Sequence, residues 1–195
     1  MGDYYGPTFG IGKFYTGAAF DTWDSTGTRS RDVNVFTADD LVAVTFLSVQ
    51  VGPLAAHVLL DERRSDFSEF LEMIGPDHDL VDEAEEIPKD WPAWELDLEL
   101  MCLPDVGPTI ASKLVARKRP RLVPVYDSVV SKVLGTKNDH WEQIRAALRR
   151  DDCAIHNRLL GLRKQAGLPD KVSVLRVLDV IAWMEGTHPD PDTVT

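Results

Sequence analysis

Apolar residues recur at helical spacing through most of the second half of the chain. In residues 108–118, Ile110, Leu114 and Val115 fall on one side of a helix, because positions three or four residues apart share a helical face. The same pattern predicts further helices at residues 128–134, 140–150, 155–162 and 173–184.

The first half carries weaker helix signals. Thr37 followed by Ala38 and two aspartates is typical of a helix start, because threonine caps free amides and acids favour the positive helix end. The apolar run 41–51 predicts a buried helix, although its β-branched content leaves a strand as the alternative. Further helices are predicted from Pro53 to Leu60, from Asp66 to Ile74 and from Trp94 to Met101.

Residues 1–36 show no helical period and are rich in Gly, Tyr, Phe, Thr and Asp. This composition predicts an irregular segment packed on the rest, with a small β-hairpin between Phe9 and Phe20 as one alternative. The chain is therefore expected to be mainly α, with a compact helical domain over 37–186 and a flexible tail over 187–195.

The net charge of the 195-residue chain is −11, which argues against nonspecific DNA binding by its whole surface. The charge is unevenly distributed, however, because residues 105–171 hold 14 Lys/Arg and 7 Asp/Glu, and the remainder is strongly acidic. A basic segment of this kind is typical of a phosphate-binding face. Helix surfaces are also often basic without any such role, which is the alternative.

The acidic excess is concentrated in residues 77–99, which hold ten Asp/Glu and one Lys. A solvated loop and helix face explains such a run, and contact with a basic protein partner is the alternative. The run has no calcium-loop pattern and the histidines have no paired spacing, so we expect no metal and no cofactor. With no long apolar run and no signal-peptide pattern, a cytoplasmic protein without membrane contact is expected.

Residues 103–111 contain the clearest candidate binding motif of the chain. Gly107 lets a backbone come close to a phosphate, Pro108 presets the first helical turn and Thr109 adds a hydroxyl. Amide groups at a helix start form a ready anion site. We expect a helix-hairpin-helix-like element at 96–118 that binds duplex DNA through phosphate contacts. The expected contact residues are Val106, Gly107, Thr109, Lys113, Arg117 and Lys118.

Asp127 lies at the start of the helix predicted over 128–134, where two roles are open to its side chain. Acids at helix starts are common caps. A carboxylate that faces an open cleft can instead serve in acid–base catalysis. Four side chains are candidates to line such a cleft, although each also suits the core: Tyr126, Trp91, Trp94 and His140.

Both motifs resemble those of the helix-hairpin-helix–Gly/Pro–Asp superfamily of DNA glycosylases. The family patterns Leu-Pro-Gly-Val-Gly-x-x-Thr-Ala and Val-Asp-Thr-His-Val are matched at Leu103, Pro104, Val106, Gly107, Ala111, Asp127 and Val130. Over residues 103–130, the resemblance implies a DNA-repair hydrolase in which Asp127 assists release of a flipped-out base. The alternative is a helical binding module without catalysis, for DNA or a protein partner, for example in a defence or toxin–antitoxin pair.

The chain also departs from that family. Thr109 stands eighteen residues before Asp127, at the position of the lyase lysine in bifunctional members, so the resemblance implies base release without strand cleavage. Asp105 replaces the first hairpin glycine, Ser128 replaces a threonine, and no iron–sulfur cysteine quartet follows. Separately, the segment 37–60, with Tyr15-Thr16-Gly17 upstream, resembles an uncharacterised bacterial family known only as a domain of unknown function.

Overall fold

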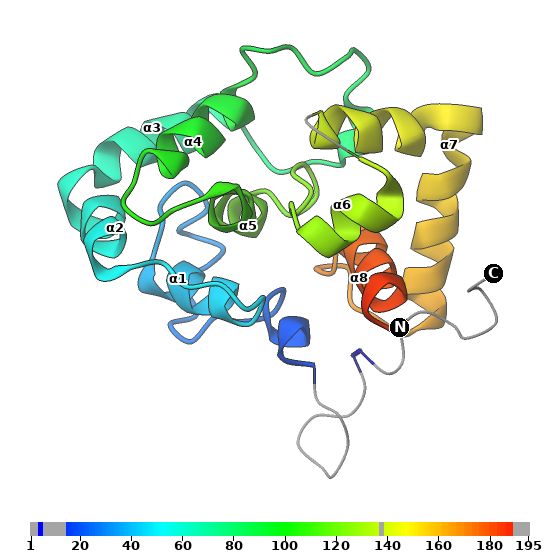
Figure 1. Ribbon diagram of the computed structural model, residues 1–195, viewed down its shortest axis with the longest axis horizontal. Coiled ribbons are helices and arrows are strands. Elements are labelled where there is room, and N and C mark those ends of the chain that lie inside the picture. The colour runs from blue at the N-terminus through cyan, green and yellow to red at the C-terminus, as the bar shows by residue number, and fades with distance from the viewer. Residues whose placement is uncertain (1–3, 6–14, 137–138, 189–195) are drawn as a thin grey trace, which may run out of the picture.

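A computed structural model describes residues 4–5, 15–136 and 139–188, and these residues are mainly helical. Figure 1 shows α1 to α5 on one side of the molecule and α6 to α8 on the other. Short 3-10 turns occur at Thr16–Ala19 and Leu80–Asp82, and a π turn at Val58–Glu62. The helices are α1 (Ala38–Thr45), α2 (Pro53–His57), α3 (Arg64–Ile74), α4 (Pro92–Met101), α5 (Pro108–Lys118), α6 (Ser128–Leu134), α7 (His140–Gln165) and α8 (Val174–Thr187).

The mainly α class is therefore confirmed. No strand occurs in the part of the chain that the structure describes. Residues 6–14, which include part of the segment where a β-hairpin was the alternative, lie outside the described residues, as does most of the tail predicted over 187–195.

Helix starts predicted from capping residues are confirmed at three places. The backbone N–H and the hydroxyl of Thr37 both donate to the Asp40 carboxylate, at 2.9 and 3.0 Å. The Ser173 hydroxyl oxygen accepts the backbone N–H of Arg176 at 3.0 Å. Pro53 is the first residue of α2, where its missing N–H costs nothing. Local side-chain chemistry decided these boundaries.

The predicted buried helix over 41–51 is wrong in its length, because α1 ends at Thr45 and the chain turns through Ser48, whose φ is 60°. The carbonyls after the helix are satisfied by distant side chains. The Thr16 hydroxyl donates to the carbonyl of Phe46 at 3.1 Å, and the Lys113 ammonium donates to that of Leu47 at 2.9 Å. Hydrogen bonds from distant side chains thus take the place of the backbone hydrogen bonds that a longer helix would have made.

The two helices predicted at 140–150 and 155–162 form the two parts of α7, which has non-helical dihedral angles from Arg150 to Cys153. The break lets the second part run along α8, as Figure 1 shows. The predicted stop after α3 is also confirmed, because Gly75 has a φ of 79°, a left-handed conformation that glycine adopts at little cost.

Helix α5 lies at the centre of the fold. It packs against both α1 and α4, and every residue from Ala111 to Lys118 is buried. Aromatic side chains of the N-terminal segment, Phe20 and Phe36, join the same hydrophobic core. Because α5 is enclosed, each of its cations needs a partner inside the protein.

Candidate functional site

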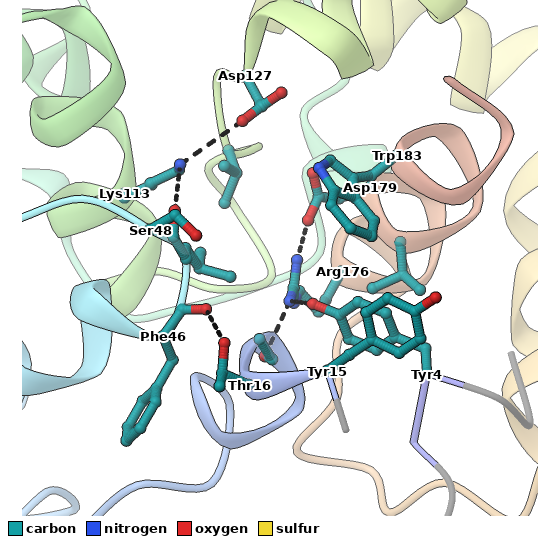
Figure 2. A pocket seen from close by; sticks show the side chains of 14 residues that line it. Tyr4, Tyr15, Thr16, Phe46, Ser48, Lys113, Asp127, Arg176, Asp179 and Trp183 are labelled. Carbon is teal, nitrogen blue, oxygen red and sulfur yellow. Dashed lines mark hydrogen bonds and ion pairs between the residues drawn. The ribbon is translucent and has the colours of Figure 1, made fainter. Parts of the chain in front are cut away.

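The structure shows Asp127 in the first of the two roles that the sequence left open, that of a helix cap. It is the N-cap of α6, and its Oδ1 accepts the backbone N–H of Val129 at 2.9 Å. Its Oδ2 lies 3.6 Å from Nζ of Lys113, and its side chain is 22% exposed. Figure 2 shows the carboxylate at the edge of a pocket, pointing toward Lys113. One carboxylate oxygen of Asp127 is used by the cap bond, and the other faces the pocket. This arrangement is compatible with acid–base chemistry in the pocket.

The Asp127 pocket, as we call it, lies where the turn after α1, helix α5, helix α8 and the N-terminal segment meet. Its volume is about 150 Å³, a size at which an apolar cavity accommodates a benzene ring. Tyr4 and Tyr15 stack with centroids 5.4 Å apart, and Trp183 meets both rings edge-on. The pocket therefore offers aromatic walls and space for one small planar group.

Charged groups of both signs face this pocket. Arg176 pairs with Asp21 at 3.2 Å and with Asp179, and its guanidinium donates to the Tyr4 hydroxyl at 2.6 Å. Burial raises the pKa of Asp179, although the adjacent arginine opposes the rise. Burial lowers the pKa of Lys113, and the Asp127 carboxylate opposes that change. The ammonium is thus held between a carbonyl and a carboxylate.

The turn that precedes α5 is open at Gly107, where an added Cβ would meet no atom within 4 Å. Asp105 has a φ of 59°, so it occupies the left-handed conformation at the position where the glycosylase pattern has glycine. The N–H of Val106 donates to the carbonyl of Leu103 at 3.2 Å, and Val106 is buried. Of the expected anion-binding amides, that of Val106 is therefore already used within the turn.

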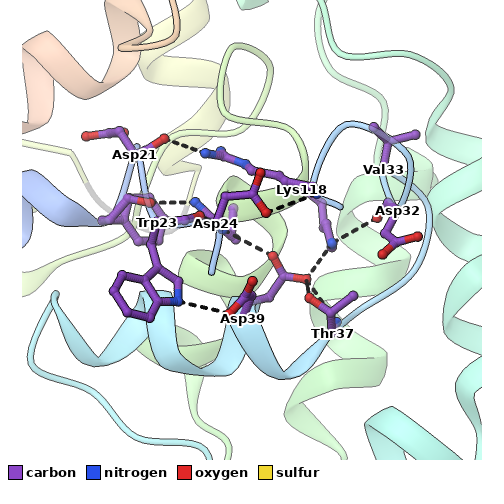
Figure 3. Close-up of polar contacts among 12 residues, drawn as sticks. Asp21, Trp23, Asp24, Asp32, Val33, Thr37, Asp39 and Lys118 are labelled. Atoms are coloured by element: carbon purple, nitrogen blue, oxygen red, sulfur yellow. Dashed lines mark hydrogen bonds and ion pairs between the residues drawn. The ribbon is translucent and has the colours of Figure 1, made fainter. Parts of the chain in front are cut away.

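The expected basic face on α5 is not present, because its cations are buried. Arg117 is 2% exposed and pairs with Asp40 at 3.1 Å, while Lys118, 7% exposed, pairs with the same carboxylate. Figure 3 shows Lys118 reaching the carbonyl of Asp32, to which its ammonium donates at 3.0 Å. The Trp23 ring N–H in the same view donates to the Asp39 carboxylate. In this conformation neither cation is available to a phosphate.

The aromatic candidates do not line the Asp127 pocket. Trp94, Tyr126 and His140 line a second pocket, which lies between α4, α5, α6 and α7. Asp127 is extended, with φ −140° and ψ 138°, and successive side chains of an extended chain point to opposite sides. Tyr126 and Asp127 therefore serve different pockets. Trp91 lines neither pocket and packs edge-on against Trp141, with the ring centroids 5.8 Å apart.

The second pocket, the Trp94–His140 pocket, contains a residue that sequence reasoning did not select. Asp97 is only 6% exposed, although it lay within a run interpreted as a solvated face. Its position three residues after Trp94, between apolar neighbours, was the available signal.

Part of the acidic run 77–99 is also used within the fold. Asp79 pairs with Arg121 at 2.7 Å, and Asp77 accepts the backbone N–H of Arg121 at 3.0 Å. Glu83 pairs with His78 at 2.7 Å. The two contacts with Arg121 tie the segment between α3 and α4 to the segment after α5.

Within residues 4–5, 15–136 and 139–188, no group of three or more His, Cys, Asp and Glu side chains is arranged to hold a metal ion. Over the same residues, no helix has both the length and the apolar character required to cross a membrane.

Comparisons with curated proteins and with solved structures gave no match. A family model matches residues 1–186, which include the N-terminal segment, helices α1 to α7 and all of α8 but its last residue. The chain therefore belongs to DUF6308, a family of unknown function.

Proposed function

We propose that this protein is a DNA N-glycosylase-like hydrolase in which Asp127 assists release of a base bound in the Asp127 pocket. The observation that carries the proposal is the position of the carboxylate. One oxygen is held by the cap bond at 2.9 Å, and the carboxylate lines an aromatic pocket of about 150 Å³.

Base release requires a group that stabilises the positive charge that develops on the sugar carbon as the base leaves. A carboxylate stabilises that charge, and it can accept a proton from the attacking water. Lys113 keeps Asp127 paired before substrate binds, at 3.6 Å. Tyr15 and Trp183 supply aromatic surface on which a flipped-out base can stack.

The proposed DNA contact is the open turn at Gly107 and Thr109, as the resemblance over residues 103–130 implies. Contacts of this kind position a duplex without reading its sequence. Because Thr109 has no amine, the expected product is an abasic site in an uncut strand.

The second candidate function is a helical binding module without catalysis, for DNA or for a protein partner. The observation that favours it is the burial of Arg117 and Lys118, whose charges are compensated by Asp40. A protein partner with a basic surface would contact the acids of residues 77–99 that remain exposed, such as Glu85 and Glu86.

The test uses the full chain and a panel of duplexes that each carry one damaged or mismatched base, with free nucleosides in parallel. Alkali converts abasic sites to strand breaks, so base release is measured directly. We expect the wild type to release a base and Asp127→Asn to lose about 10²–10⁴-fold in rate. The asparagine keeps an oxygen for the Val129 amide, so the fold is retained.

The matched control is Asp139→Asn, which removes the same charge from another helix N-terminus, where the residue is exposed. Its rate should equal that of the wild type. Retained activity in Asp127→Asn would remove this residue from the mechanism. Salt-dependent duplex binding without release of any base would favour the binding module instead.

A further inference from the structure

The Trp94–His140 pocket is distinct from the site of the proposed glycosylase chemistry. It has a volume of about 520 Å³, within the range of roughly 300–1,000 Å³ that is usual for small-molecule sites. Residues of α4, α5, α6 and α7 line it, and Figure 1 shows α5 and α6 near the centre of the molecule, with α4 above on one side and α7 above on the other. None of its lining residues also lines the Asp127 pocket.

Asp97 is the unusual group in this pocket. Its Oδ1 has no hydrogen-bond partner, and no other buried side-chain nitrogen or oxygen in the described part of the chain lacks one. No cation of the described residues pairs with it, and burial alone raises its pKa to about 7. An unpaired buried carboxylate is costly, so its presence requires an explanation.

Two serine hydroxyls and the imidazole of the pocket have hydrogen-bond partners within the protein. Ser112 Oγ accepts a backbone N–H at 3.1 Å, and the Ser131 hydroxyl donates to a backbone carbonyl at 2.7 Å. His140 contacts the Thr136 hydroxyl at 2.7 Å through Nδ1 and a backbone carbonyl at 3.2 Å through Nε2. Among the residues that line the pocket, Asp97 is thus the one with a buried acceptor that has no partner.

The remaining walls are apolar and aromatic. Trp94 and Trp141 stack with centroids 3.7 Å apart, and Tyr126 meets His140 edge-on at 5.5 Å. Met101 and Pro108 complete the lining. Aromatic faces attract cations, most strongly where water is excluded.

We propose that the Trp94–His140 pocket binds a small organic cation whose N–H groups donate to the Asp97 carboxylate while its apolar body packs against Trp94 and Trp141. A cation compensates the buried charge, which a neutral donor does not, and an anion would be repelled. The amine, amidine and guanidine classes all have this chemistry.

The probe is benzamidine, which carries a planar cation on one ring, and its neutral counterpart is benzamide. Isothermal titration of the full wild-type chain at pH 8 should show benzamidine binding at least tenfold tighter than benzamide. Asp97→Asn should weaken benzamidine binding at least tenfold and leave benzamide unchanged. Glu95→Gln, the same charge change at an exposed position of α4, should bind as the wild type does.

Binding should also weaken at pH 5, because Asp97 is then protonated while the probe stays charged. The other titratable groups that line the pocket are His140 from α7 and Tyr126 from the segment before α6, and burial lowers the pKa of His140. Equal affinity for benzamidine and benzamide, or unchanged binding by Asp97→Asn, would overturn the proposal. Neither result depends on Asp127, so failure of this site and failure of the glycosylase chemistry are distinguishable.

Discussion

Replacing Asp97 by Asn should change stability in a strongly pH-dependent way in the ligand-free protein. The side chain is 6% exposed, and burial raises its pKa from 3.8 to about 7. In the unfolded chain the carboxyl ionises near its ordinary pKa, so unfolding releases a proton at any pH between these values. This carboxyl therefore costs the wild type almost no stability below pH 3.8, and its cost grows as pH rises to about 7.

The size of the effect follows from the shift. Roughly three pKa units at about 1.4 kcal/mol each give a cost of about 4 kcal/mol at pH 8, and under about 1 kcal/mol at pH 4. Asparagine has no charge to bury, although its amide is still unpaired. That amide cost is the same at both pH values, so it cancels in the comparison.

Urea unfolding of the wild type and of Asp97→Asn at pH 4 and pH 8 measures the prediction. The stability of the variant relative to the wild type should be higher at pH 8 than at pH 4 by about 3–4 kcal/mol. Glu95→Gln, on the same helix and exposed, should show a much smaller difference. A relative stability of Asp97→Asn that is the same at both pH values would refute the burial of an unpaired carboxylate.

Two further predictions concern the packing that positions the pockets. Asp40→Ala leaves Arg117 and Lys118 buried without their carboxylate. It should lower the free energy of unfolding by about 3–5 kcal/mol, measured by urea titration. A loss under about 1 kcal/mol would contradict the buried ion-pair network. Gly186→Ala places a Cβ against Val129 and within 2.9 Å of Val133, so it should cost about 1–3 kcal/mol, by strain between α6 and α8. Gly161→Ala is the matched control, because an added Cβ there meets no atom within 4 Å. It should stabilise α7 by about 0.5–1 kcal/mol. Equal effects of the two substitutions on the free energy of unfolding would exclude strain at Gly186.

Most helix positions could be predicted from local sequence signals. Capping at Thr37 and Ser173, the proline at the start of α2 and the glycine after α3 are local chemistry, and local chemistry can be read without knowing the fold. The sequence also placed Asp127 at a helix start, where the structure has it.

Which charges are buried depends on how the helices pack against one another. The α5 cations are interpreted from sequence as a basic surface, yet α1 supplies Asp40 as their partner and the segment before α1 supplies main-chain carbonyls such as that of Asp32. Asp97 lies in an acidic run that the sequence suggests is exposed. It is buried without a partner because helices from distant parts of the chain pack around it. Periodicity reports which residues share a face of one helix, whereas burial and charge pairing depend on what packs against that face.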